Sequence, residues 1–524
     1  MPPLVFTVRP AGSDPERLRA LAADQTLAQA VYLSGLFRPP ALCSGIGRCG
    51  RCRMRLSPPP DPLPEDKLVF SPQELAQGWR LGCRHPPESG LCVELPSCIP
   101  AEPVAPARRR PCGDDGAFLA VDLGTTSLEW RLEARDRTLL CQGGRLNPQM
   151  GAGSEVIARL AAAASEQGRA RLQKLIWSAL SALVRPDELK AVCLAANPAM
   201  TALALGREIS GLARAPYSLP LAGGNWEKLP FWPPIWVPPL LSPFVGGDIS
   251  AGYASLALDP EKPAPDWPFL LADLGTNGEF LLALSPTEGL AASVALGPAL
   301  EGIGLSCGTE ARPDAVTGFS LTPQGPRPIF FQESPGLAPV GITGTGYLSL
   351  LHVLRRAGAL SEEGRFTLAR SPVLRKAGKT PAGFSGLAGQ EAAVPAIFLE
   401  GGLRLTAGDV EEILKVKAAF SLGLRRLLAA AGLEAADLSC IYLAGALGRF
   451  ADKEALETLG FFPPGSGNRL QVVGNSSLAG AALLLARPEA REALLAWADG
   501  VKTLDLAADS VFLREFVAGM RFAW

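Results

Sequence analysis

The chain has 524 residues, a formal net charge of −1, 48% hydrophobic residues and 19% charged residues. This length predicts two or three domains, because a single hydrophobic core does not normally grow so large. The near-zero charge argues against binding to nucleic acid or to an anionic membrane, and the hydrophobic content argues against bulk disorder.

The N-terminal residues 1–8 lack the basic region and the long apolar core of a secretory signal. The most apolar stretch, 229–245, carries six prolines, which would break a membrane-spanning helix. We interpret this stretch as an irregular buried connection, with an exposed docking surface as the alternative. The sequence therefore predicts a cytoplasmic protein that has neither a nucleic acid nor a membrane as its partner.

Residues 1–98 are expected to form a small first domain. Residues 4–8 alternate and are rich in β-branched types, which predicts a strand. Thr26 can cap a helix that continues to about Ser34, and residues 91–95 predict a closing strand. The chain has eleven cysteines, and without a secretion signal they favour a metal or redox site over disulfides.

Four of these cysteines form a pattern: Cys43, Cys49, Cys52 and Cys83. Four thiolates are the ligand set of a [2Fe-2S] cluster. The glycines between the first three, Gly45, Gly47 and Gly50, would let backbone N–H groups approach the sulfurs. A structural zinc site is the alternative, but zinc ribbons usually use two short cysteine pairs and only Cys49 and Cys52 form one.

The C-x5-C-x2-C spacing, followed by Leu-Gly-Cys about thirty residues later, resembles that of ferredoxins with a β-grasp fold. The resemblance implies that Cys43, Cys49, Cys52 and Cys83 hold a [2Fe-2S] cluster. His85 follows Cys83 by two residues, and we expect it to be a surface histidine rather than a ligand. Residues 99–116 are rich in proline and predict a semi-rigid linker.

Two related glycine turns follow, at 122–127 and 273–279. Each begins with an aspartate after an apolar run, Asp122 or Asp273, and continues with glycine and a hydroxyl residue. Glycine lets the backbone approach a phosphate, and the carboxylate can hold a metal or orient a water. The pair predicts two lobes, 117–268 and 269–524, that grip one nucleotide. Two ordinary hairpins are the alternative.

The remaining elements are expected to be mixed helices and strands. Helices are predicted from about 154 and over 172–183, and a buried strand over 191–195. Thr406 is a plausible N-cap for a long helix to about Ala431. A strand over 440–444 leads into a third glycine turn, and the helix that includes Leu478 and Leu485 closes the pattern.

The three glycine turns resemble those of the acetate/sugar-kinase, heat-shock ATPase and actin superfamily. The resemblance implies two phosphate loops and one adenosine loop that converge on ATP with Mg²⁺. Asp122, Asp273 and Glu279 would carry the chemistry. The cofactor-binding residues implied are Gly124, Thr125, Thr126, Ser127, Gly275, Thr276, Asn277, Gly278, Gly445, Ala446 and Gly448.

The whole chain resembles a narrower family, the reductive activators of corrinoid-dependent enzymes. Further stretches that carry this resemblance are 147–149, 197–201, 245–249, 297–302, 341–346 and 474–477. It implies an α/β multidomain protein, with a β-grasp ferredoxin-like α+β domain followed by a two-lobed actin/sugar-kinase-like ATPase. The expected activity is ATP-dependent, one-electron reduction of Co(II) to Co(I).

The partners that this resemblance implies are a corrinoid protein or corrinoid-dependent methyltransferase and an upstream low-potential electron donor, with a homodimer as the expected assembly. Two other functions stay open. One is a small-molecule kinase with an accessory cluster, for which Asp248 or Glu279 could be the base. The other is a redox-sensing binding module that no longer hydrolyses nucleotide.

Overall fold

The computed structural model describes residues 4–10, 16–20, 25–34, 36–37, 42, 45, 47, 50–96, 116–334, 336–367, 396–445, 452–506 and 511–524. The predicted linker lies outside these ranges except for its last residue, Gly116. Four predicted site residues also lie outside them: Cys43, Cys49, Ala446 and Gly448.

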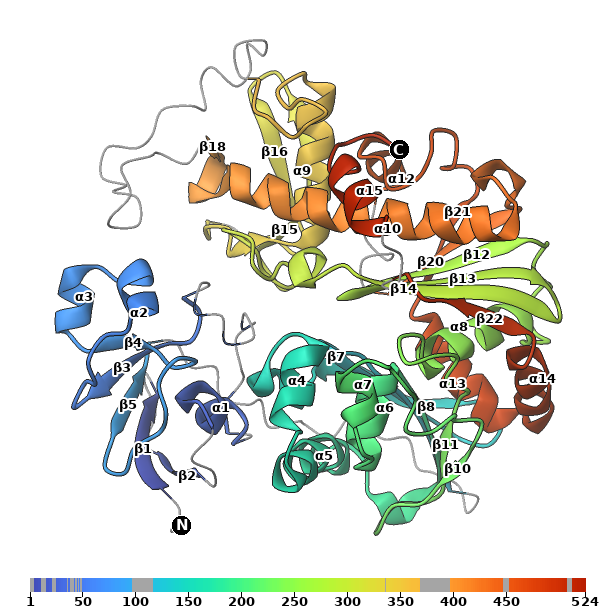
Figure 1. Cartoon of the computed structure of the whole chain (residues 1–524), viewed down its shortest axis with the longest axis horizontal. Helices are drawn as coiled ribbons and strands as arrows, with labels where there is room; N and C mark the ends of the chain where they lie inside the picture. The colour runs from blue at the N-terminus through green and yellow to red at the C-terminus, as the bar shows by residue number, and fades with distance from the viewer. Residues whose placement is uncertain are drawn as a thin grey trace.

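The N-terminal part of the chain forms a mixed five-stranded sheet in the order β2-β1-β5-β3-β4 (Figure 1, blue). The strands are β1 (Leu4–Pro10), β2 (Glu16–Ala20), β3 (Arg53–Ser57), β4 (Trp79–Leu81) and β5 (Cys92–Leu95). The three helices are α1 (Leu27–Tyr32), α2 (Pro64–Val69) and α3 (Pro72–Ala76). Only β1 and β5 run parallel. This arrangement agrees with the α+β fold expected for the first domain.

Helix α1 begins where the sequence predicts. The Thr26 hydroxyl accepts a hydrogen bond from Gln29 N, and the Gln29 side chain bonds back to Thr26 N, which completes a capping box. The helix buries Leu27 and Val31 in one cluster with Phe6 of β1. It ends two residues earlier than predicted.

The middle part of the chain forms a six-stranded sheet in the order β10-β11-β9-β6-β7-β8. Its strands are β6 (Ala117–Leu123), β7 (Ser127–Glu133), β8 (Leu139–Leu146), β9 (Leu189–Ala196), β10 (Asn225–Glu227) and β11 (Ile235–Val237). The helical segments around it are η1 (Pro148–Ala152), α4 (Val156–Ala162), α5 (Glu166–Ser181), η2 (Pro186–Glu188), α6 (Pro198–Leu205), α7 (Ser210–Ala213) and α8 (Gly247–Ala257). The predicted helices near 154 and 172 and the buried strand near 191 are therefore present.

The C-terminal part forms a second six-stranded sheet in the order β21-β20-β12-β13-β14-β22. Its strands are β12 (Phe269–Leu274), β13 (Asn277–Ser285), β14 (Glu288–Ala295), β20 (Cys440–Ala444), β21 (Leu470–Gly474) and β22 (Val501–Leu504). Smaller sheets contain β15 (Ala315–Thr322), β16 (Gly325–Phe330), β17 (Gly341–Ile342), β18 (Ala396–Phe398) and β19 (Arg404–Thr406). The helical segments are η3 (Pro298–Glu301), α9 (Gly344–Arg356), η6 (Glu400–Gly402), α10 (Ala407–Ala431), η7 (Ala435–Asp437), α12 (Lys453–Thr458), α13 (Ser476–Ala486), α14 (Pro488–Ala498) and α15 (Phe512–Ala518).

The two large sheets repeat one plan. In the first, β6, β7 and β8 form an antiparallel meander, and β9 lies parallel to β6. In the second, β12, β13 and β14 form the meander, and β20 lies parallel to β12. Both predicted glycine turns are the hairpin turns at the start of these meanders. The structure therefore supports two related lobes rather than two unrelated hairpins.

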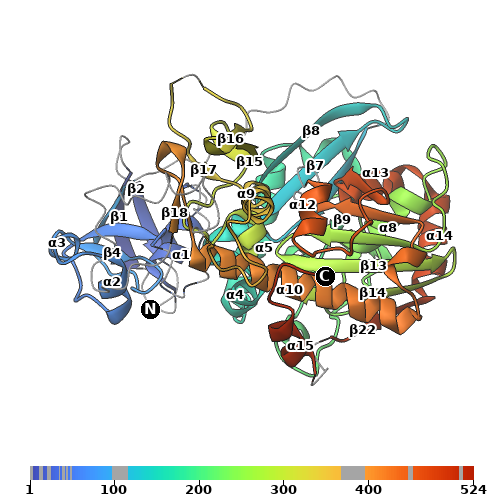
Figure 2. The same ribbon diagram turned by 90° about the horizontal axis from the view of Figure 1, so that it is seen from above.

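Helices α8 and α13 lie between the two large sheets and share a buried core with both (Figures 1 and 2). Helix α13 comes late in the chain, yet it packs on β6 and β9 of the first sheet. Gly480 permits this packing, because a Cβ at this position would lie 1.7 Å from the carbonyl oxygen of Ala251 in α8. One pair of helices in backbone contact therefore holds the two sheets together.

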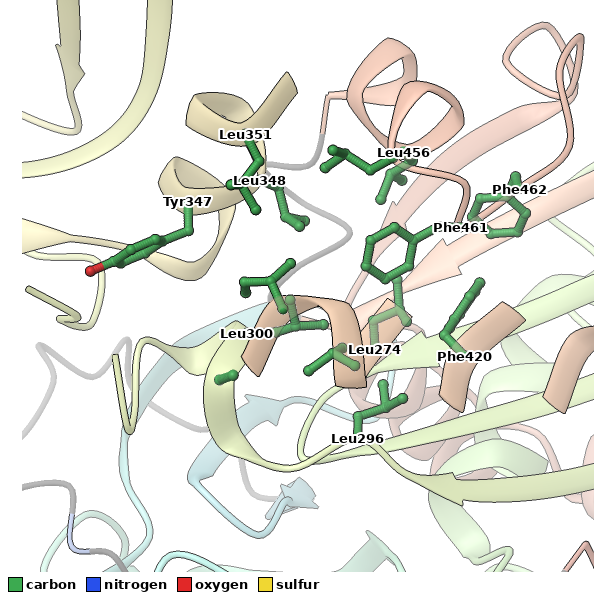
Figure 3. Close-up of a cluster of buried hydrophobic side chains, with 14 of the residues drawn as sticks. Leu274, Leu296, Leu300, Tyr347, Leu348, Leu351, Phe420, Leu456, Phe461 and Phe462 are labelled. Carbon is green, nitrogen blue, oxygen red and sulfur yellow. The ribbon is translucent and has the colours of Figure 1, made fainter. Parts of the chain in front are cut away.

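The far face of the second sheet is covered by the long helix α10. Thr406 caps this helix in a capping box with Asp409, as the sequence predicts, and the helix ends at the expected residue, Ala431. Its Phe420 lies in a buried cluster with Phe461 and Phe462 (Figure 3). Leu300 of η3 belongs to the same cluster, so the short segment η3 is anchored in this core.

The proline-rich stretch 229–245 is only partly the irregular buried connection that we predict. It contains strand β11, which pairs with β9 and is fully buried, so a strand was missed. Phe231 at one end is 95% exposed, whereas Val245 at the other is buried. None of the helices in the described ranges is long and apolar enough to cross a membrane.

The contact between α8 and α13 gives a first prediction. Gly480→Ala should lower the free energy of unfolding by about 2 kcal/mol or more, because the new methyl group overlaps a backbone oxygen that cannot move alone. Gly408→Ala is the matched control, since its Cβ would meet no atom nearer than 3.6 Å and helix propensity favours alanine. Chemical denaturation of both variants measures the difference. Equal stability of the two would contradict the close crossing.

Candidate nucleotide site

A cleft of about 420 Å³ lies where the two meanders face each other. Its volume is in the range of small-molecule sites. The predicted residues that line it are Asp122, Gly124, Thr125, Thr126, Ser127, Asp273, Gly275, Thr276, Asn277, Glu279 and Gly445. Gly278 is described but does not line the cleft. Its Cβ would lie 2.9 Å from Leu296 Cδ1, so a glycine is needed there for packing.

Each hairpin presents two carboxylates to the cleft. Asp122 on β6 lies opposite Glu129 on β7, and Asp273 on β12 lies opposite Glu279 on β13. Asp248, in the first turn of α8, adds a fifth carboxylate. The sequence singled out three of these residues as catalytic, and Glu129 was missed because it lies beyond the recognisable turn.

Burial and mutual repulsion raise the pKa values of Asp122, Asp248 and Asp273. Burial, helped by the charges of Asp273, Asp248 and Glu129 and opposed by a hydrogen bond from Asn475, raises the pKa of Asp122 to about 8. Burial is also the main cause that raises the pKa of Asp248 to about 7 and that of Asp273 to about 6. A divalent cation would reverse this repulsion, since opposite charge favours the ionised form.

Glu279 supports the same interpretation. Burial and the charges of Asp248, Asp273 and Asp122 raise the pKa of Glu279 well above its ordinary value. Its Oε1 is buried and has no hydrogen-bond partner among the described residues. A buried acceptor without a partner is costly, so this atom is suited to a metal ion, a metal-bound water or a donor on a ligand.

The described residues contain no group of three or more histidine, cysteine or acidic side chains arranged to hold a metal ion.

Four helices begin at the cleft. Their N-terminal residues Asn197 (α6), Asp248 (α8), Thr343 (α9) and Asn475 (α13) all line it. Helix N-termini carry partial positive charge and free N–H groups, which favour phosphate. The Asn197 side chain also donates to the Thr125 hydroxyl at 3.2 Å and so orients it toward the cleft. The site thus combines acidic groups for a cation with helix ends for an anion.

Asn475 and Ser477 connect the two lobes at Asp122. Asn475 Nδ2 donates to Asp122 Oδ2 at 2.7 Å and to Glu129 Oε2 at 3.0 Å, and Ser477 Oγ donates to Asp122 Oδ1 at 3.1 Å. Asn475 is the N-cap of α13 and Ser477 lies in its first turn, and neither was among the predicted site residues. The stretch 474–477 did belong to the family pattern, which was the signal that could have identified them.

The third glycine turn approaches the site at Gly445. This residue has a φ of +81°, and a Cβ would lie 2.3 Å from Asp273 Oδ1. A side chain at this position would therefore collide with a cleft carboxylate. Gly445 therefore borders the cleft, next to Asp273.

Glu301 is a further cleft residue that the sequence did not assign. Its carboxylate accepts hydrogen bonds from Thr126 of the first turn and from Thr276 of the second, the latter at 3.0 Å. The two hydroxyl oxygens are 3.3 Å apart. One carboxylate therefore joins the two predicted phosphate loops.

In the N-terminal sheet, the two described cysteines of the predicted cluster lie at the same end of the β3–β4 pair. Arg53 pairs with Leu81, and Gly82 N donates to Cys52 O at 2.9 Å. A Cβ at Gly82 would lie 2.6 Å from Met54 Sδ, so only glycine fits before Cys83. Gly45, Gly47 and Gly50 all have positive φ, as a tight loop around a cluster requires. These features fit a cluster-binding loop.

His85 is not the surface histidine that we predicted. It is buried, and its Nε2 lies 2.7 Å from Asp66 Oδ2. Asp66 also accepts hydrogen bonds from the backbone N–H groups of Leu63 and Leu81. The sequence could not indicate this pair, because Asp66 lies 19 residues away on another element.

The repeated meanders, the two helices between them and the shared cleft define an actin/sugar-kinase-like nucleotide-binding protein. Two family models match the chain: the RACo middle region over residues 118–261 and the C-terminal domain of RACo, the ASKHA domain, over 268–524. The chain therefore belongs to the RACo family, the reductive activators that its motifs resemble.

Two curated proteins are similar to the chain. The corrinoid activation enzyme RamQ of Eubacterium limosum is 27% identical over 446 residues, which are 77% of this chain and 70% of that protein. The [Co(II) methylated amine-specific corrinoid protein] reductase of Methanosarcina barkeri is 29% identical over 47% of this chain and 43% of that protein. A solved reductive activator for corrinoid, iron-sulfur protein covers 99% of this chain and 98% of its own with a TM-score of 0.64 and 21% identity, which supports the same fold.

The raised pKa of Asp122 gives a second prediction. Between its unfolded pKa near 3.8 and its folded pKa of about 8, the folded protein keeps a proton that the unfolded chain releases. The stability of the nucleotide-free protein should therefore fall as the pH rises from 5 to 8. Asp122→Asn removes this titration, so its melting temperature should fall less steeply. Melting curves of both proteins across this range measure the difference, and parallel curves would contradict the assignment.

Proposed function

We propose that the protein is an ATP-dependent reductive activator of a corrinoid protein. It transfers one electron to the Co(II) corrinoid, which becomes Co(I), and it uses ATP to make this transfer proceed. The observation that carries the proposal is the combination, in one chain of the RACo family, of the two-lobed nucleotide cleft with cysteines spaced as four cluster ligands.

Different residues of the cleft would bind different parts of the nucleotide. The hydroxyls of Thr125, Thr126 and Thr276 and the helix N-termini would hold the phosphates. Asp122, Asp273 and Glu279 would bind Mg²⁺ or orient the attacking water, in keeping with their raised pKa values. Gly445 would border the adenosine, because no side chain fits between it and Asp273.

Cys43, Cys49, Cys52 and Cys83 would hold the [2Fe-2S] cluster, which supplies a one-electron carrier when bound. Burial of Cys52 and Cys83 would keep water away from their sulfurs. An uphill one-electron transfer costs about 1.4 kcal/mol per 59 mV. A nucleotide that binds one conformation more tightly than another can supply on the order of several kcal/mol, which is enough to offset this cost.

A third prediction concerns the cysteines. Cys52→Ala and Cys83→Ala should each lower the iron and sulfide content and bleach the visible absorbance of the purified protein, because each removes one of four ligands. Cys193→Ala is the control, since Cys193 is buried in the core between the two large sheets. Iron and sulfide analysis with absorbance spectra measures the effect. Stoichiometric zinc without iron in the wild-type protein would contradict the cluster.

A fourth prediction concerns the reaction. With a reductant and a Co(II) corrinoid protein, Co(I) absorbance should develop with ATP but not without it. Asp273→Ala should abolish the ATP-dependent yield, because it removes a carboxylate from the phosphate turn, and should leave the cluster absorbance intact. Cys83→Ala should abolish Co(I) formation but retain nucleotide binding. Equal Co(I) yields with and without ATP would contradict the proposed coupling.

A further inference from the structure

We infer that Arg51 and Glu301 are positioning residues that couple occupancy of the nucleotide cleft to the placement of Arg51 and the adjoining Cys52. The inference rests on the proposed function only in that ATP fills the cleft. It adds a specific structural path between the nucleotide cleft and the predicted cluster ligand Cys52. This path consists of Glu301, the segment 302–309 and Arg51.

The path begins at the phosphate turns. The Glu301 carboxylate accepts hydrogen bonds from the hydroxyls of Thr126 and Thr276. These hydroxyls are the donors that we assign to phosphate. Burial raises the pKa of Glu301, whereas these two hydroxyls and the charge of buried Arg159 favour its ionised form. A phosphate competes for the same donors and repels a carboxylate. Glu301 in its present position therefore opposes the nucleotide.

The segment that follows Glu301 can transmit its displacement because it is tightly folded. Gly302 has a φ of +76°, and a Cβ there would lie 2.4 Å from Thr309 O. A Cβ at Gly308 would lie 2.0 Å from Gly302 O. The two ends of the segment are thus in backbone contact, and Thr309 lines the cleft itself. A displacement of Glu301 should therefore move the whole segment 302–309 and not be absorbed by a flexible loop.

On the N-terminal side of Glu301, the segment η3 is anchored in the core. Leu300 lies in the apolar cluster with Leu348 and Leu351 (Figure 3). A Cβ at Gly344, the first residue of α9, would lie 1.8 Å from Leu300 O. Displacement of Glu301 should therefore turn 302–309 about this anchor rather than shift the whole element.

Arg51 connects this segment to the N-terminal part of the chain, next to Cys52. Its Nη2 donates to Gly302 O at 3.4 Å and to Gly308 O at 3.2 Å, so one guanidinium bridges both ends of the segment. Arg51 directly precedes Cys52, a predicted cluster ligand. The N-terminal part of the chain also contacts the middle part, through the packing of α1 on η1 and through Leu42 O, which accepts from Ser154 Oγ at 2.5 Å. Arg51 adds a contact to the segment 302–309, beside the cleft.

Nucleotide binding should therefore weaken the Arg51 contact and release Arg51 and the adjoining Cys52 from the segment 302–309. Linkage is reciprocal, so the contact must weaken nucleotide binding by the same factor. Arg51→Met removes the two hydrogen bonds and keeps the apolar stem. It should consequently tighten the binding of a nucleotide that it does not touch.

The test uses the full-length, cluster-loaded protein and the non-hydrolysable ATP analogue AMPPNP with Mg²⁺. Titration calorimetry should show that Arg51→Met binds about fivefold more tightly than wild type, the lower end of typical coupling. Arg55→Met is the matched control, because Arg55 donates to Gln77 O and pairs with Glu94 of its own sheet. Its affinity should equal that of wild type. Equal or weaker binding by Arg51→Met, with intact cluster absorbance, overturns the inference.

A second variant keeps the test valid if Arg51→Met folds poorly. Glu301→Gln retains a hydrogen-bond acceptor but loses the charge that repels phosphate, so it should also tighten AMPPNP binding. In the double variant the gain should be less than the product of the two single effects, because both act through 302–309. Fully multiplicative effects would overturn the shared path.

Hydrogen exchange gives a readout that a purely structural arginine would not move. AMPPNP should speed exchange of the backbone amides of 302–309 in wild type, whereas Arg51→Met should show fast exchange without nucleotide. Unchanged exchange on nucleotide binding overturns the inference but leaves the proposed function standing. Failure of wild type to bind AMPPNP at all would instead remove the proposed function itself.

Discussion

The site depends on the close crossing of α8 and α13. Gly480 lets the two backbones touch, and the two helices fill the space between the large sheets. Each helix also begins at the cleft, α8 with Asp248 and α13 with Asn475. The crossing therefore sets the distance between the hairpins and places two helix N-termini at once. Asn475 and Ser477 then fix Asp122 from the opposite lobe, so the electrostatics of the cleft follow from the packing behind it.

The cleft combines negatively charged carboxylates with the partial positive charge of helix N-termini. This combination determines which ligands it can bind. Without a cation, burial and the repulsion between neighbouring carboxylates raise the pKa values of Asp122, Asp248 and Asp273. Without an anion, four helix N-termini point at a space with no negative ligand other than these acids. A magnesium nucleotide supplies a cation for the carboxylates and phosphate anions for the helix N-termini, so a single ligand satisfies both. Glu301 partly substitutes for the anion, because it accepts the hydroxyls of Thr126 and Thr276.

Local patterns predicted the elements that carry local signals. The capping boxes at Thr26 and Thr406, the two glycine turns and the buried strands are present as expected, because caps, turns and apolar runs are determined by neighbouring residues. Contacts across the fold could not be predicted in this way. His85 was predicted to lie at the surface but pairs with the buried Asp66, and no local pattern indicates that Glu301 bridges two turns 150 residues apart. The six prolines near β11 suggested an irregular segment, although β9 imposes strand pairing on it.

The position of α13 in the sequence has a consequence for the synthesis of the protein. The first sheet is complete in the chain by Val237, the end of β11, but α13, which covers β6 and β9, begins only at Ser476. As the chain leaves the ribosome, this sheet face is exposed until most of the second half has been made. Its apolar side chains, such as Cys193 and Ala195 of β9, are fully buried in the finished protein. Translation speed over the second half thus sets how long this apolar face stays exposed, and a chain released before α13 lacks the helix that covers it.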